Sequence, residues 1–147
     1  EPQAQHELQQ FALYGVMTLV PLKDPAVRVQ ETAPGKDGTR NLHVEHPNAP
    51  PMDLRFDKAG KLIRIADSVR DPAGGATPIP QVIELSGEIV SNGVKWPKRI
   101  SIKQNDQPYF DLEIATFDAR TTFSLAPIKH TLDTDDRAPN QSGADAG

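Results

Sequence analysis

The sequence predicts a mainly β fold: a strongly curved antiparallel sheet, or unclosed β-barrel, with little helix and Pro-rich loops. Residues 80–117 alternate apolar and polar side chains in three runs separated by turn signals. A second pair of alternating runs flanks residues 57–60. Turn signals recur roughly every 8–12 residues, an interval typical of antiparallel sandwiches and open barrels.

Residues 80–117 predict a meander of three strands. In the first run, residues 80–90, one side carries Ile83, Leu85, Gly87 and Ile89, and these alternate with Glu84, Ser86 and Glu88. Asn92 and Gly93 follow, and this pair suits a type I′ hairpin turn because both central positions take positive φ. The return run, residues 94–102, is interrupted by Pro97.

A second turn at residues 105–108 leads to the third run, in which Phe110, Leu112 and Ile114 alternate with acidic residues. The apolar positions of all three runs should share one concave face, which is either covered by the N-terminal segment or left partly open as a pocket. This face would carry Ile83, Leu85, Ile89, Trp96, Ile100, Ile102, Phe110, Leu112 and Ile114.

The N-terminal third is less regular. Residues 1–7 are polar and predict an arm or a short helical lead-in. The apolar run that follows is ambiguous between helix and strand, and its β-rich composition favours a strand over residues 13–21, with at most one helical turn before it. Short strands are expected at residues 27–30 and 41–45.

The middle of the chain predicts a hairpin between two loops. Residues 46–51 contain three prolines and predict an irregular, extended connector. Residues 52–56 and 61–65 read as strands, joined by a turn at 57–60 that ends in glycine. Residues 68–79 are rich in Pro and Gly and predict a long loop.

The length of 147 residues suits one domain. We expect a single β-domain with an N-terminal arm over residues 1–128, followed by a polar, solvated C-terminal tail over residues 129–147. Phe123, Leu125 and Ile128 could add an edge strand just before that tail.

Composition excludes several classes of protein. The chain has no cysteine, which excludes disulfides, thiolate metal sites and cysteine nucleophiles. Its net charge of −4 does not favour nucleic acid as a partner. The longest apolar run, residues 14–22, is shorter than the ~20 residues that a transmembrane helix needs.

The chain begins at Glu1, in a stretch rich in Gln and Glu. This start suggests a processed or trimmed chain whose export signal, if it had one, is no longer visible, although a cloning boundary would give the same first residue. A processed chain of this kind would be extracytoplasmic.

One spacing suggests a metal site. In a strand, His43 and Glu45 would share a face, and with His46 they could hold Zn²⁺ or Cu²⁺. Two histidines beside a Pro-rich loop, without a third ligand in a fixed motif, are more typical of surface residues. We favour the surface interpretation and expect neither a metal nor a cofactor.

No catalytic motif is recognisable, and we expect no enzyme. Ser86 lies in a predicted strand and lacks the first glycine of a nucleophile elbow. The one basic cluster surrounds Trp96 and could make a peripheral contact with an anionic membrane surface. The favoured alternative is that its cations balance carboxylates on neighbouring strands. The cations are Lys95, Lys98, Arg99 and Lys103, and the carboxylates are Glu84, Glu88, Asp111 and Glu113.

The stretch from Leu85 to Ile102, with Asn92-Gly93 and Trp96-Pro97, resembles the strand pair of the periplasmic lipoprotein carriers, the LolA/LolB-like superfamily. The hairpin from Phe56 to Leu62 fits the same pattern, so the resemblance covers about residues 50–117. It implies an unclosed β-barrel lined with apolar side chains, export, and binding of acyl chains or lipid-modified proteins without catalysis. The chain departs from the family in lacking long helices to cover the barrel.

The functional hypothesis is a non-enzymatic, extracytoplasmic β-domain that binds an apolar ligand or a segment of a lipid-modified partner on its concave face. The alternative is a structural accessory subunit of an envelope or membrane-associated complex. The expected ligand-binding residues are Trp96, Phe110, Leu112, Ile83, Leu85 and Ile100.

Overall fold

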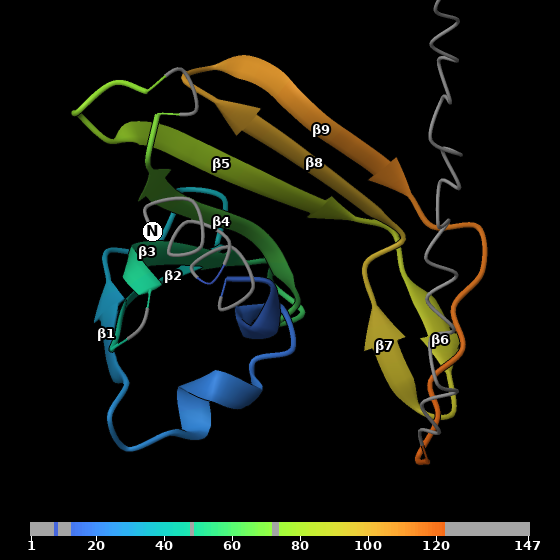
Figure 1. The fold of residues 1–147 in the computed structure, drawn as a ribbon. Helices are drawn as coiled ribbons and strands as arrows, with labels where there is room; N and C mark the ends of the chain where they lie inside the picture. Colours follow the sequence, from blue (N-terminus) through green and yellow to red (C-terminus); the bar gives the residue numbers. More distant parts are fainter. Residues whose placement is uncertain (1–7, 9–12, 48, 72–73, 123–147) are drawn as a thin grey trace, which may run out of the picture.

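The fold is built on one curved antiparallel sheet of seven strands, which does not close into a barrel (Figure 1). The structure, a computed structural model, describes residues 8, 13–47, 49–71 and 74–122. Along the sheet the strands are β1 (Arg28–Thr32), β2 (Arg40–His46), β3 (Ala49–Phe56), β4 (Leu62–Val69), β5 (Ile79–Ser86), β8 (Arg99–Gln104) and β9 (Gln107–Glu113). Each strand pairs with its neighbour in antiparallel register, which confirms the predicted fold class.

A two-stranded ribbon, β6 (Ile89–Ser91) and β7 (Val94–Trp96), is inserted between β5 and β8 and turns away from the sheet (Figure 1). Gly87 interrupts the first predicted run with a φ of 65°, and Pro97, which has no amide hydrogen, interrupts the return run. Asn92 and Gly93 take φ values of 48° and 78° at the tip of the ribbon, as the predicted hairpin turn requires.

The strand predicted over residues 13–21 is wrong. Residues 13–16 are α-helical, and a 3₁₀-helix, η1 (Val20–Lys23), follows. Leu13, Val16 and Met17 are spaced by three and four residues, so a helix directs all three toward the sheet, and all three are buried. Their packing outweighs the β propensity of the segment.

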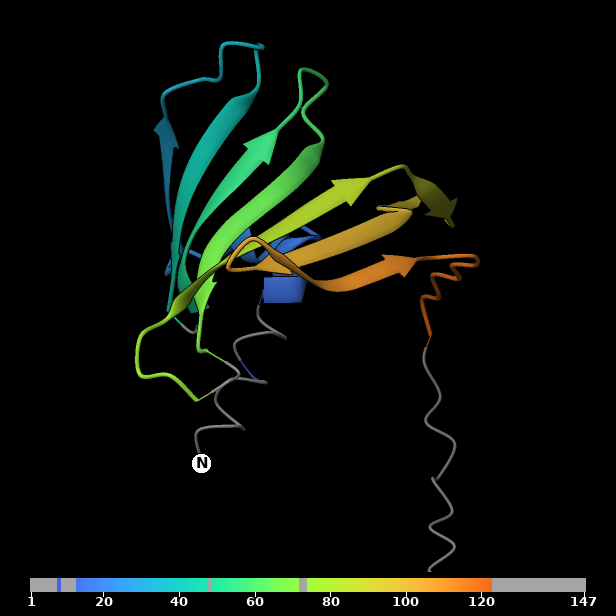
Figure 2. The ribbon, with the colours of Figure 1, turned by 90° about the horizontal axis from the view of Figure 1, so that it is seen from above.

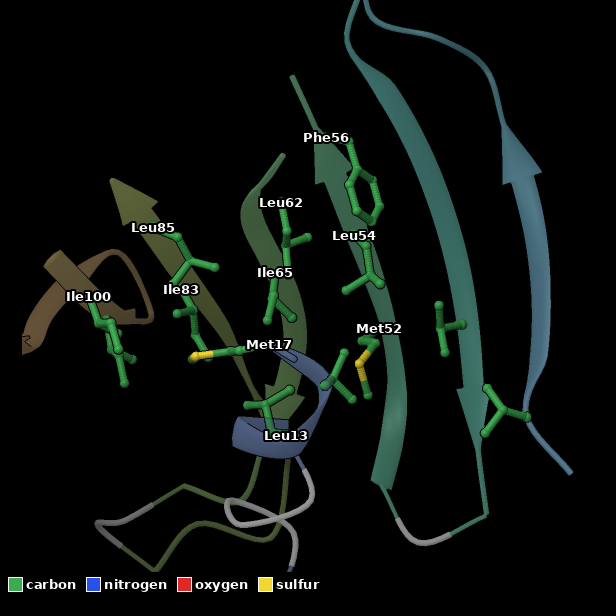
Figure 3. Close-up of a cluster of buried hydrophobic side chains, with 14 residues drawn as sticks. Leu13, Met17, Met52, Leu54, Phe56, Leu62, Ile65, Ile83, Leu85 and Ile100 are labelled. Atoms are coloured by element: carbon green, nitrogen blue, oxygen red, sulfur yellow. The ribbon is translucent and has the colours of Figure 1, made fainter. Parts of the chain in front are cut away.

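The helical segment, residues 13–23, lies against one face of the sheet, which we call the concave face (Figure 2). Leu13 and Met17 sit over the middle strands, next to Met52, Ile65 and Ile83 (Figure 3). The core therefore lies between this helical segment and β2, β3, β4, β5 and β8. Its buried members are Leu13, Val16, Met17, Val27, Val44, Met52, Leu54, Phe56, Leu62, Ile65, Ile83, Leu85, Ile100 and Ile102.

The Pro-rich connector predicted at residues 46–51 is shorter than expected. Strand β3 already begins at Ala49, so Pro50 and Pro51 lie inside it. The register between β2 and β3 shifts between Val44 and His46, opposite these prolines. A bulge leaves ladder positions without a hydrogen bond, so a strand tolerates proline there.

The predicted hairpin at residues 57–60 is confirmed. Gly60 has a φ of 80°, and Oδ1 of Asp57 accepts hydrogen bonds from the backbone amides of Ala59 and Lys61, each 2.9 Å long. Between β3 and β4 the register shifts next to this turn, so that Phe56 faces Leu62 whereas Arg55 faces Arg64. Ile63 is the extra residue of this bulge.

Several predictions fall outside the described residues. These are the polar arm at residues 1–7, the edge strand of Phe123, Leu125 and Ile128, and the tail at residues 129–147. Among the residues that are described, no helix has the length and apolar character required to span a bilayer.

Candidate functional site

The six residues predicted to bind a ligand do not share one surface: five lie on the concave face of the seven-stranded sheet, and Trp96 lies on the ribbon of β6 and β7. They also differ in exposure. Ile83, Leu85 and Ile100 are 0%, 5% and 6% exposed and belong to the core beneath the helical segment. Figure 3 shows them on adjacent strands, close to Met17. In this structure they support the sheet and do not line an open surface.

Phe110 and Leu112 continue the same face onto the edge strand β9. Phe110 pairs with Ile102 and Leu112 with Ile100, so their side chains extend two rows of the core by one strand. The helical segment does not bury them: Phe110 is 45% exposed and Leu112 39%. We call these two side chains the apolar edge.

Trp96 is the last residue of β7, in the ribbon. It packs against the core cluster and stacks on Phe117, with ring centroids 6.2 Å apart. Phe117 belongs to the segment after β9, which also contacts the ribbon: the Ala119 amide donates to Oγ of Ser91 at 3.1 Å. Sequence reasoning missed this contact because nothing local in the segment after β9 indicates that it returns to the ribbon.

A ladder of three polar side chains crosses the concave face at the other end of the same strands. Gln104 donates from Nε2 to Oε1 of Gln81 at 2.9 Å, and Gln81 donates from Nε2 to Oδ1 of Asp67 at 3.2 Å. Gln81 and Gln104 are 1% and 7% exposed. The alternation in the sequence could have revealed this buried position, because Gln81 lies two residues before Ile83 and therefore on the same side of β5 as Ile83 and Leu85.

Asp67 is the most perturbed carboxyl group of the described residues. Burial raises the pKa of Asp67 to about 6, although the hydrogen bond from Gln81 acts in the opposite direction. A carboxyl group with such a pKa can exchange a proton near neutral pH. Among the described residues, the hydrogen bonds that affect the Asp67 carboxyl group come from Gln81 and from its own backbone.

The basic cluster around Trp96 is balanced, as the favoured interpretation predicted. Arg99 makes two hydrogen bonds to Asp111, of 2.9 and 2.5 Å, which lower the pKa of that carboxyl group below its usual value. The other three pairs are Lys103 with Glu84 at 3.5 Å, Lys95 with Glu88 at 3.7 Å and Lys98 with Glu113 at 3.7 Å. Each of the four cations thus has a carboxylate partner, and Glu88 is shared with Lys61 at 4.0 Å.

The residues of the metal hypothesis have cross-strand partners. His43 contacts Asp53 through Nδ1 at 2.8 Å, and Glu45 pairs with Arg28 at 3.7 Å. Within the described part of the chain, no three His, Cys, Asp or Glu side chains are grouped as metal ligands would be. The side chains of His43 and Glu45 are 37% and 54% exposed.

No protein-family model, no curated protein and no solved structure matches the chain.

Proposed function

We propose that the chain is a non-enzymatic binding domain that takes up an apolar group, an acyl chain of a lipid or of a lipid-modified protein, at the apolar edge. One observation carries this proposal: the two apolar rows of the concave face are buried at Ile102 and Ile100 and then continue to Phe110 and Leu112, which stay 45% and 39% exposed.

The chemistry of the surroundings supports an apolar ligand. On the opposite face of β8 and β9, the charged side chains pair with one another, as Arg99 does with Asp111. An acyl chain lying along the apolar edge would contact Phe110, Leu112 and the partly buried Trp96 without displacing an ion pair. Each 200 Å² of apolar surface removed from water would contribute roughly 5 kcal/mol before the entropic cost of association.

The test is a titration of delipidated protein with a fluorescent fatty acid. The wild-type protein should show saturable binding. Replacing Phe110 and Leu112 together by serine should weaken binding at least tenfold, because each lost contact is expected to contribute about 1 kcal/mol. The change should leave the fold intact, since both side chains are already about half exposed on an edge strand.

Val90 offers a matched control. It is 55% exposed and lies on β6, where it faces Lys95 in the ribbon, on the side opposite Trp96. Val90→Ser removes a similarly exposed apolar side chain and should leave the titration unchanged. Absence of saturable binding by the wild-type protein, or equal binding by the double variant, would overturn the proposal.

A second candidate function is that of an accessory subunit, favoured by the exposure of β9 as a whole. All seven residues of this strand are exposed, and β9 is the last strand at its end of the sheet. An edge of this kind can pair with an extended segment of another protein. In that case the fatty acid would not bind, and the protein purified from its source would be recovered within a complex that the double serine variant fails to enter.

A further inference from the structure

The outer face of the sheet, opposite the helical segment, carries two guanidinium groups directly opposite each other. Arg55 on β3 faces Arg64 on β4. Side chains opposite each other on one face of a sheet have Cβ atoms about 4.5–5.5 Å apart, and like charges in this arrangement destabilise it. A nearby anion would offset the repulsion within such a pair.

The pair exists because of the bulge at Ile63. From Phe56 opposite Leu62, a regular hairpin would place Arg55 opposite Ile63, whereas the register shift places it opposite Arg64. Bulges are frequent where a strand must direct a side chain to a functional position. Here the bulge brings two cations together on one face.

The two arginines differ in how their charges are satisfied. Nε of Arg55 donates to Oδ1 of Asn41 at 3.1 Å. Nε of Arg64 is buried, and it finds no hydrogen-bond acceptor among the described residues. A buried donor of a charged group without an acceptor is costly, so this nitrogen of Arg64 is unsatisfied, and no carboxylate forms an ion pair with the side chain among the described residues.

The neighbouring carboxylates are already engaged. Glu84, which faces Arg64 on β5, pairs with Lys103 at 3.5 Å. Asp53 contacts His43 at 2.8 Å. Hydrogen bonds from the side chain and backbone of Thr39 lower the pKa of Asp37, and the charge of Arg55 adds a smaller lowering. None of these carboxylates forms an ion pair with Arg64.

The arginines border a hollow in the surface of about 330 Å³, which Thr32, Asn41, Asp53 and Ala66 also line. A volume of this size lies at the lower end of the range for small-ligand sites, roughly 300–1,000 Å³. Two guanidinium forks present planar sets of donors that match the oxygens of a phosphate group. Two positive charges also match the two negative charges of a phosphate monoester.

We propose that Arg55 and Arg64 form a binding site for a phosphate group, separate from the apolar edge and on the opposite face of the sheet. The phosphate oxygens accept hydrogen bonds from both guanidinium groups, and the anion relieves their mutual repulsion. The group comes either from a soluble phosphate compound or from the headgroup of a phospholipid, and both sources share this chemistry.

The first experiment measures binding of inorganic phosphate to the full chain by calorimetry, with chloride added to hold the ionic strength constant. The wild-type protein should bind phosphate saturably. Arg64→Gln should weaken binding at least tenfold, and Arg55→Gln should also weaken it. Arg99→Gln is the matched control, because Arg99 lies on the same face but is paired with Asp111; it should bind phosphate as the wild type does.

Thermal unfolding gives a second readout. Because Arg64→Gln removes an unpartnered cation, it should unfold at a temperature equal to or above that of the wild type in phosphate-free buffer. Added phosphate should raise the unfolding temperature of the wild type and not that of the variant. The proposal would be overturned if phosphate stabilised the wild type and Arg64→Gln equally. It would also be overturned if the variant unfolded at a lower temperature than the wild type without phosphate, or if the wild type bound no phosphate saturably.

Vesicles distinguish the two sources of the phosphate. Binding to phosphatidic acid vesicles and not to phosphatidylcholine vesicles, lost in Arg64→Gln, assigns the site to a lipid headgroup. Saturable binding of inorganic phosphate without vesicle binding assigns it to a soluble compound. If Arg64→Gln changes neither vesicle binding nor binding of inorganic phosphate, the proposed site is contradicted.

Discussion

Gln104 donates a hydrogen bond to Gln81 across strands β8 and β5, at 2.9 Å, on the same sheet face as the buried Ile83 and Ile102. Gln81 in turn donates a hydrogen bond to Asp67 on β4. Oε1 of Gln104 is buried and has no hydrogen-bond partner among the described residues, so the ladder has an unsatisfied acceptor at one end and a perturbed carboxyl group at the other. Two predictions follow from this arrangement.

Asp67→Asn should stabilise the protein at pH 7.5 and not at pH 4. Burial raises the pKa of Asp67 to about 6 in the folded state, against 3.8 for the free group. Between these values the folded state binds more protons than the unfolded state, so stability falls as the pH rises from about 4 to about 6. Asparagine stays neutral at every pH, and its side-chain oxygen can still accept the hydrogen bond from Gln81.

The shift corresponds to at most about 3 kcal/mol, and because Asp67 keeps some exposure we expect a gain of about 1–2 kcal/mol at pH 7.5. Urea unfolding of both proteins at the two pH values measures it. If Asp67→Asn lowers the free energy of unfolding by the same amount at pH 4 and at pH 7.5, the charged carboxylate of Asp67 does not destabilise the folded wild-type protein.

Gln81→Leu should cost more stability than Gln104→Leu. The first change removes both hydrogen bonds and leaves a buried amide of Gln104 without its acceptor, at an expected cost of about 2–4 kcal/mol. The second removes one hydrogen bond and exchanges the unsatisfied oxygen of Gln104 for that of Gln81, so it should cost about 1 kcal/mol. Urea unfolding at pH 7 ranks the two, and the reverse order would mean that the ladder is not connected as described.

Gly87→Ala should destabilise the protein more than Gly60→Ala. Both glycines have positive φ, 65° and 80°, but an added Cβ at Gly87 would lie 2.9 Å from Cβ of Lys98, whereas at Gly60 it meets nothing within 4 Å. We expect about 1 kcal/mol for Gly60→Ala, from backbone strain alone, and about 2–3 kcal/mol for Gly87→Ala. Unfolding in urea measures both, and equal losses would contradict the close approach at Lys98.

The turns were predictable from the sequence because their chemistry is local. Asn92 and Gly93 accept positive φ, and Asp57 bonds the amides of its own turn, whatever the rest of the chain does. The helical segment was not predictable in this way. Its apolar residues fit a strand as well as a helix, and the choice depends on how Leu13 and Met17 pack against a sheet formed from residues far along the chain.

The candidate sites depended on register, which the sequence leaves open. That Phe110 and Leu112 share a face with Ile100 followed from alternation, but that the helical segment stops short of them did not. The pairing of Arg55 with Arg64 arises from a bulge that moves the register by one residue. Neither residue is distinctive in the sequence, because an isolated arginine in a strand is an ordinary outward-facing residue.

Phe117→Ala should expose Trp96 and loosen the segment after β9. The stacked rings are expected to contribute about 0.5–1.5 kcal/mol beyond the area they bury, and the remaining contacts of this segment with the ribbon include hydrogen bonds to Ser91 and Asn92. The sequence contains a single tryptophan, so fluorescence emission reports on Trp96 alone. Emission should shift to longer wavelength in Phe117→Ala. Phe110→Ala is the control, because it removes a half-exposed ring that is not stacked on Trp96, and it should leave the emission wavelength unchanged. An emission shift in Phe110→Ala and none in Phe117→Ala would contradict the stacking.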